Sequence, residues 1–318
     1  MASPKMCTSS FQRSIHIYSL SETNTIGYYD AGDYPRAVES LERNVAILQS
    51  DLLYEHLDTG AIVAATSRAW LSLCHAERGA FTEGLALAEE GRRIAETVNH
   101  PFSLIEACNG ISVVSLRQGD VQRAIAMLER AMSLCQDWHL LLFVPRQAGS
   151  LGVAYALDGR ITAGLALVEQ GVEHVVARGR ARGLAPAVVC LSEVYLLADR
   201  LEEACQRATQ ALDLARQYQQ RGNEAWALWL LGESTARQAS PKIASAASHY
   251  RQALALVEEL GMRPLQAHCH RGLGMLYATT GQREQARTAL STAIEMYQSM
   301  EMAFWLPQAE AALTQVDA

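Results

Sequence analysis

The sequence LGVAYALDGRITAG at residues 151–164 decides the fold, because closely similar stretches recur along the chain. Two of them are LSEVYLLADRLEEA at residues 191–204 and LGMLYATTGQREQA at residues 273–286. Each contains a Leu, a small residue next to it, a Tyr, a turn, and a second small residue five positions after the turn Gly or Asp. We call this second small residue the anchor. The anchors are Ala37, Gly84, Ala124, Gly164, Ala204, Ala246 and Ala286, where Ala246 follows a longer turn.

The anchors recur at a nearly constant spacing. Successive anchor numbers differ by forty in four of the six intervals, by forty-seven in the first and by forty-two in the fifth. A fixed period of this length is typical of arrays in which each repeat is one supersecondary unit. Further small residues follow seven positions after most anchors, which places them on the same face of a helix. The pattern therefore predicts a helix, a short turn and an antiparallel helix in each unit.

This pattern resembles the tetratricopeptide repeat over about residues 15 to 303. The resemblance implies an all-α fold, a right-handed superhelical solenoid of about seven helix pairs. Because the period here is about six positions longer than the usual repeat of roughly 34 residues, each helix should be nearly one turn longer. Residues 263–313 also resemble the C-terminal repeat regions of bacterial signal-transduction ATPases and adenylate cyclase-type regulators. That second resemblance implies a sensor or interaction arm.

The ends of the chain differ from the repeats. We expect residues 1–12 to be a disordered N-terminal segment and residues 13–303 to hold the seven repeats. The sequence FWLPQAEAALTQV, residues 304–316, is amphipathic and continues past a Pro. It predicts a C-terminal capping helix over residues 304–318, which would cover the apolar face of the last repeat.

Charge and cysteine content restrict the partners and the compartment. With 27 Lys and Arg against 34 Asp and Glu, the net charge is -7, which disfavours binding to nucleic acid and to anionic membranes. The seven cysteines show neither zinc nor redox spacing and are too few for a disulfide framework. With no signal-peptide pattern and no run of eighteen apolar residues, we expect a cytoplasmic protein.

Sequence motifs give no indication of catalysis. The chain contains no phosphate-binding G-x-x-x-x-G-K-[ST], no H-E-x-x-H and no G-x-S-x-G. His268, Cys269 and His270 are consecutive, but residues two apart on a helix diverge by about 200° and do not readily share one metal ion. We therefore expect no enzyme activity, no cofactor and no metal site.

The helix period predicts which residues face the inner surface of the solenoid. In the first helix of each unit these are the positions 18, 15, 11 and 8 before the anchor, and two positions further back in the sixth unit, whose turn is two residues longer. Charged and aromatic residues from these positions make up the candidate binding site, which consists of Arg146, Glu193, Trp226, Trp229, Glu233, His268 and Arg271. Aromatic side chains beside Arg are typical of interaction hot spots. The alternative that Trp226 and Trp229 fill the core between repeats stays open.

These features favour a non-catalytic binding module. The expected partner is a protein or peptide segment in the inner groove, with a small-molecule effector as a variant of the same role. An alternative from a different class is a self-assembling scaffold, in which the chain forms a homo-oligomer. A scaffold should show a mass that rises with protein concentration, and a sensor need not.

Overall fold

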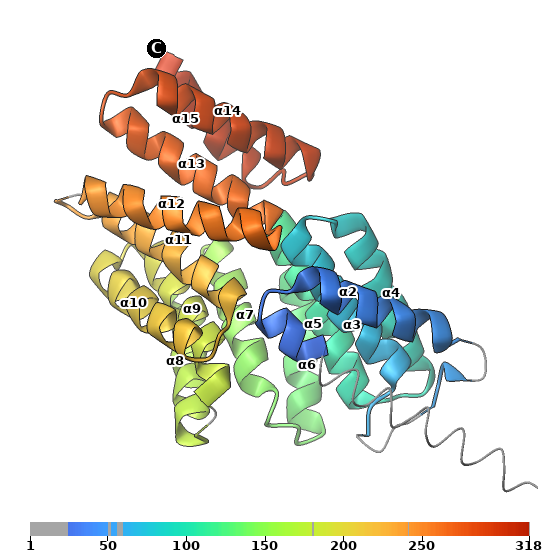
Figure 1. Cartoon of the computed structure of the whole chain (residues 1–318). Coiled ribbons are helices and arrows are strands. Elements are labelled where there is room, and N and C mark those ends of the chain that lie inside the picture. Colours follow the sequence, from blue (N-terminus) through green and yellow to red (C-terminus); the bar gives the residue numbers. More distant parts are fainter. Residues whose placement is uncertain (1–24, 50–51, 56–59, 180, 241, 318) are drawn as a thin grey trace, which may run out of the picture.

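The computed structural model describes residues 25–49, 52–55, 60–179, 181–240 and 242–317, and the predicted disordered segment 1–12 lies outside these ranges. The described residues form helices that follow one another in antiparallel pairs (Figure 1). The helices are α2 (Tyr34–Ile47), α3 (Val63–Arg78), α4 (Phe81–Thr97), α5 (Pro101–Gln118), α6 (Val121–Asp137), α7 (Val144–Leu157), α8 (Ile161–Ala177), α9 (Ala181–Leu197), α10 (Leu201–Gln217), α11 (Arg221–Arg237), α12 (Ile243–Leu260), α13 (Arg263–Thr279), α14 (Arg283–Ser299) and α15 (Leu306–Asp317).

The predicted fold class is confirmed. In the described part of the chain, a short helical segment at residues 25–30 pairs with α2, and α3 to α14 form six further pairs. The last helix, α15, packs on α14 and α13 and caps the array. The described residues thus form an all-α superhelical solenoid of seven helix pairs. The exact division into repeats at residues 13 and 303 stays a prediction.

Turns between paired helices have local causes. Gly79 and Gly119 end α3 and α5 in the left-handed conformation, with φ of 78° and 100°. Glycine adopts this conformation without the steric cost that a Cβ atom imposes. Asp120 caps α6, because its side chain accepts a hydrogen bond from the backbone N–H of Arg123. The turns therefore reverse the chain within a few residues.

Small residues bring the paired helices into close contact at the anchor positions. A Cβ atom on Gly152 would lie only 2.7 Å from the carbonyl oxygen of Gly164, and one on Gly164 only 2.5 Å from that of Gly152. In the next unit the hydroxyl of Ser192 donates a hydrogen bond to the carbonyl of Ala204 at 2.8 Å. The residue twelve before each anchor thus packs against the anchor helix, as the sequence pattern predicts.

Two of the recurring tyrosines join their unit to the one before it. The hydroxyl of Tyr155 donates to the Glu129 carboxylate at 2.7 Å, and that of Tyr195 donates to Glu169 at 2.9 Å. The donor and acceptor lie 26 residues apart in both cases, so the same contact recurs after one period of the sequence. It connects the first helix of one unit with the second helix of the preceding unit.

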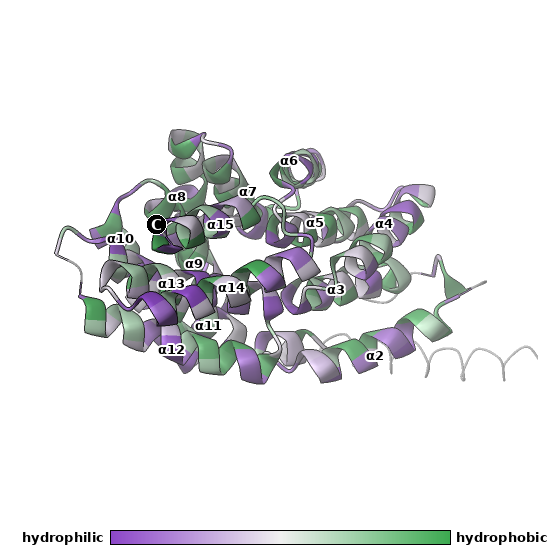
Figure 2. Cartoon of the chain, turned by 90° about the horizontal axis from the view of Figure 1, so that it is seen from above, coloured by the Kyte–Doolittle hydropathy of each residue, from purple (hydrophilic) through white to green (hydrophobic). Residues whose placement is uncertain are grey.

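The solenoid curves far enough for its last unit to reach its second and third units. Helix α13 contacts α3, and Figure 2 shows α14 next to α3. One apolar cluster combines Ala76 and Val114, from α3 and α5, with Ala293 and Tyr297 of α14. Gly119, at the end of α5, packs against Phe304, so that a Cβ atom there would lie 2.4 Å from it. The chain therefore forms a closed, ring-like array.

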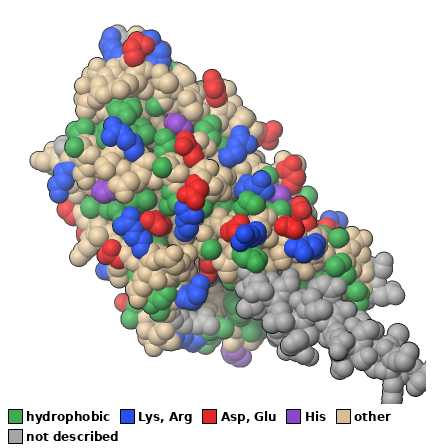
Figure 3. Space-filling model, in the orientation of Figure 1, with side chains coloured by type: hydrophobic (Ala, Val, Ile, Leu, Met, Phe, Trp, Pro, Cys, Tyr) green, Lys and Arg blue, Asp and Glu red, His purple; other side chains and the backbone are tan. Residues whose placement is uncertain are grey.

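The outer surface carries charges of both signs. On the face shown in Figure 3, Lys and Arg side chains alternate with Asp and Glu. The chain also forms ion pairs along its helices, such as those of Arg92 with Glu89 and Glu96 at 2.8 Å each. Ion pairs that remain in contact with water contribute about 1 kcal/mol or less each. None of the helices in the described residues is long and apolar enough to cross a bilayer.

Candidate functional site

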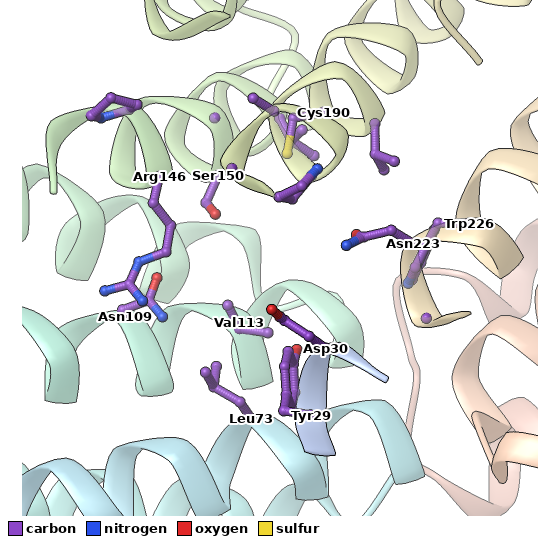
Figure 4. Close-up of a pocket in the computed structure, with 18 of the residues that line it drawn as sticks. Tyr29, Asp30, Leu73, Asn109, Val113, Arg146, Ser150, Cys190, Asn223 and Trp226 are labelled. Carbon is purple, nitrogen blue, oxygen red and sulfur yellow. The ribbon is translucent and has the colours of Figure 1, made fainter. Parts of the chain in front are cut away.

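The inner surface of the solenoid surrounds a cavity of about 720 Å³ (Figure 4). Its wall is built mainly from the first helices of the second to sixth units, which are α3, α5, α7, α9 and α11. Tyr29 and Asp30, from the segment before α2, project into it from the N-terminal side. The cavity therefore draws residues from six of the seven units.

In the third to sixth units, most of the positions that the sequence predicts to face inward line the cavity. Three of the seven candidate site residues, Arg146, Glu193 and Trp226, line the cavity. Other inward positions that line it are Asn109, Val113, Leu116, Gly149, Val153, Pro186 and Val189. The helix period therefore identified the inner face of these helices from sequence.

The other four candidates do not line the cavity. Trp229, Glu233, His268 and Arg271 are between 4% and 8% exposed and take part in the packing of the last two units. The His268 ring lies 5.7 Å from that of Trp229, and its Nδ1 is 2.7 Å from the Tyr297 hydroxyl. The expectation that these four residues face an open groove is wrong, because neighbouring side chains cover them.

The contacts of Arg271 and Glu233 explain their burial. Arg271 donates a hydrogen bond to the Gln308 side chain of α15 at 2.7 Å and lies 3.8 Å from Glu233. Glu233 also accepts a hydrogen bond from the Tyr250 hydroxyl at 2.9 Å. Trp305 packs edge-on against His268 at 4.9 Å. The closure of the ring and the cap thus cover the inward face of the sixth and seventh units.

A charged cluster joins the two halves of the ring at the cavity wall. The Arg117 guanidinium donates to the Glu77 carboxylate at 2.9 Å and lies 3.9 Å above the Trp226 ring. The Trp226 indole N–H donates to the other Glu77 oxygen at 3.4 Å. Burial opposes the charge on Arg117, but the Glu77 and Glu193 carboxylates outweigh it and raise the pKa of Arg117.

The other two arginines of the wall are also paired. Arg146 forms an ion pair with the buried Glu106, and Arg182 lies 3.7 Å from Asp30. Burial raises the pKa of the Asp30 carboxyl, and the Arg182 charge opposes this shift. Each arginine that lines the cavity therefore has a carboxylate partner.

Asn109 and Glu193 are polar residues of the wall that lack such a partner in the described part of the chain. The Oδ1 atom of Asn109 is buried without a hydrogen-bond partner among the described residues, and the side chain faces the cavity (Figure 4). Glu193 has no ion pair or hydrogen bond within the same ranges, and burial raises its pKa although the Arg117 charge lowers it. Buried polar groups usually have partners, so unpaired ones at a cavity indicate a place for a ligand.

Sequence reasoning missed Glu77 and Arg117, although a signal was present. Both lie seven positions before their anchors, so they occupy equivalent positions in adjacent units, 40 residues apart. Glu106 and Arg146 are paired across the same separation of 40 residues. Opposite charges at one repeat position in neighbouring units thus indicate an ion pair along the inner face. Within the described residues, no group of three or more His, Cys, Asp and Glu is placed to hold a metal.

Comparison with known proteins supports the repeat assignment. The family model of the tetratricopeptide repeat matches residues 242–299. No curated protein matches the chain in sequence.

Solved structures with the same fold cover most of the chain. A Rap protein complexed with competence and sporulation factor is 12% identical with a TM-score of 0.67, and the match covers 95% of this chain and 86% of that one. The Rap conjugation gene regulator of plasmid pLS20, in complex with the Phr* peptide, is 16% identical with a TM-score of 0.65, covering 87% and 74%.

A third similar structure is a signal transduction ATPase with numerous domains from Pyrococcus horikoshii, which has a tetratricopeptide repeat sensor. It is 14% identical with a TM-score of 0.56, and the match covers 90% of this chain but only 43% of that protein. These likenesses concern the fold, since all three identities are low. Residues 242–299 thus match the tetratricopeptide repeat, and the described residues as a whole share the solenoid fold of these solved structures.

Proposed function

We propose that this chain is a non-catalytic regulatory module that binds a short peptide in the central cavity. The observation that carries the proposal is the cavity itself, which combines apolar and aromatic walls with the unpaired Asn109 carbonyl. Its volume of about 720 Å³ falls in the range of roughly 300–1,000 Å³ that is common for ligand sites. A cavity of this size accommodates a short peptide rather than a folded domain.

The chemistry of the wall suits a peptide. An extended peptide offers unpaired backbone N–H and C=O groups, and the Asn109 amide can accept from one and donate to the other. Trp70, Phe143 and Trp226 provide aromatic surfaces for apolar side chains. Two of the similar solved structures are complexes, one with competence and sporulation factor and one with the Phr* peptide, which supports a peptide as the class of ligand here.

The alternative role as a homo-oligomeric scaffold has less support. The terminal face of the last unit is covered by α15, and the inward face of that unit is packed against α3 and the cap. A scaffold needs a free terminal face to pair with another copy. We therefore treat a concentration-dependent mass as the outcome that would favour the scaffold.

A peptide selection tests the proposal. The purified chain is mixed with a pool of random synthetic hexapeptides, separated rapidly by gel filtration, and the retained peptides are identified by mass spectrometry. The variant Ser150→Phe places a ring in the cavity from a partly buried position of α7, so it should lose the retained peptides. Ser133→Phe, on the exposed face of α6, is the control and should retain them. Equal retention by all three proteins would refute the proposal.

A further inference from the structure

We infer that the ligand of the cavity carries one cationic group, an ammonium or a guanidinium, and that Glu193 is its partner. This inference rests on the proposed function and specifies which peptides the cavity selects. It depends on the balance of charges among the described residues of the cavity wall, where one carboxylate remains after the other charges are paired.

Each of the three arginines that line the cavity has a carboxylate partner. Arg117 is bound to Glu77 at 2.9 Å, Arg182 lies 3.7 Å from Asp30, and Arg146 is paired with Glu106. Each arginine is thus neutralised by a carboxylate from another helix or segment. An anionic ligand would have to compete with these existing pairs, so the described residues of the wall offer it no free cation.

Glu193 differs from the other carboxylates of the wall. It lies on α9, lines the cavity, and forms no ion pair or hydrogen bond within the described residues. Arg117 is near enough to affect its pKa, but that guanidinium is already held by Glu77. The group of Glu77, Arg117 and Glu193 therefore has a net charge of about -1 when both carboxyls are ionised.

Burial makes the charge of this unpaired carboxylate energetically costly. A partly buried ion without a partner loses hydration that nothing in the protein replaces. A ligand cation restores a partner in surroundings of low dielectric, where a charge pair is stronger than in water. Asn109, only 2% exposed and with an unpaired Oδ1, gives the same ligand a second polar contact on another wall of the cavity.

The cation can come from the N-terminal ammonium group of the peptide or from a Lys or Arg side chain. The test uses two pools of random hexapeptides, one with free N-termini and one N-acetylated, applied to the wild-type chain. Enrichment of Lys and Arg in the acetylated pool identifies the side chain as the source. Retention of peptides from the free pool alone identifies the N-terminus.

The variants Glu193→Gln and Glu193→Lys test the residue itself. For a retained peptide, Glu193→Gln should weaken binding about tenfold or more, which corresponds to about 1.4 kcal/mol or more. Glu193→Lys should shift the retained peptides toward Asp and Glu. Glu202→Gln, an exposed carboxylate on α10, makes the same change in charge outside the cavity and should leave binding within about twofold.

The outcomes separate this inference from the proposed function. If the wild-type chain retains peptides without a bias to cations, or Glu193→Gln binds them equally well, the inference is overturned and the proposed function stands. If the wild-type chain retains no peptide, both fail. Melting curves of both variants establish that lost binding does not come from unfolding.

Discussion

Close packing between paired helices can be tested at two glycines of the same helix. Gly164 and Gly171 both lie on α8, seven residues apart, and both are buried. A Cβ atom on Gly164 would lie 2.5 Å from the carbonyl oxygen of Gly152, whereas one on Gly171 would meet its nearest atom, the Pro145 carbonyl oxygen, at 3.4 Å. The substitutions Gly164→Ala and Gly171→Ala therefore add the same methyl group at a site without room for it and at a site with room for it.

The expected magnitudes follow from these distances. The contact at Gly164 is about 1 Å shorter than the roughly 3.5 Å of an optimal non-bonded contact, and a backbone carbonyl cannot rotate away as a side chain does. Overpacking costs up to about 3 kcal/mol, and the gain in helix propensity from Gly to Ala returns about 1 kcal/mol. Gly164→Ala should thus lose about 2 kcal/mol, while Gly171→Ala should gain up to about 1 kcal/mol.

Thermal unfolding followed by circular dichroism measures both effects. A difference of about 3 kcal/mol between the two variants corresponds to roughly 4–5 °C in melting temperature for a chain of this size. The wild-type protein should melt between them. If Gly164→Ala is as stable as Gly171→Ala, the two helices are not in the close contact that the anchor pattern predicts, and the repeat register is wrong.

Three further predictions concern the cavity and the closure of the ring. Asn109→Leu removes a buried carbonyl group without a hydrogen-bond partner, which costs about 1–3 kcal/mol of stability, so the variant should be as stable as the wild type or more stable. It should nevertheless bind a selected peptide more weakly. A melting temperature below that of the wild type would contradict this prediction. Burial raises the pKa of Glu193 in the folded state above the value of about 4.5 in the unfolded chain. As the pH rises from the unfolded to the folded pKa, the wild type should therefore lose stability relative to Glu193→Gln, and below the unfolded pKa the difference in stability should not change with pH. Melting curves of both proteins from about pH 4 to 8 measure this difference, and a wild type that gains stability with rising pH would contradict the prediction. Trp305→Ala removes the indole that packs on His268 and Gly119, so it should lower the melting temperature. It should also enlarge the radius of gyration in small-angle X-ray scattering. An unchanged radius would mean that the array of helices stays closed without this indole.

The sequence determined the parts of this protein that depend on neighbours along the chain. Its regular period predicts the helix pairs, because residues on one helix face recur at fixed spacing whatever the rest of the chain does. The contact of Gly152 with Gly164 and the inward positions of Arg146, Glu193 and Trp226 follow from the same spacing. Each lies within one unit or faces the common axis of the array.

Only the tertiary structure decided which inward faces stay open. The small rotation from each unit to the next adds up over the array, and no local pattern gives its sum. That sum brings α14 and the Phe304 turn against α3 and α5, and the indole of Trp226 to Glu77, 149 residues away. Trp229, Glu233, His268 and Arg271 are covered for this reason, although they share the sequence positions of residues that line the cavity.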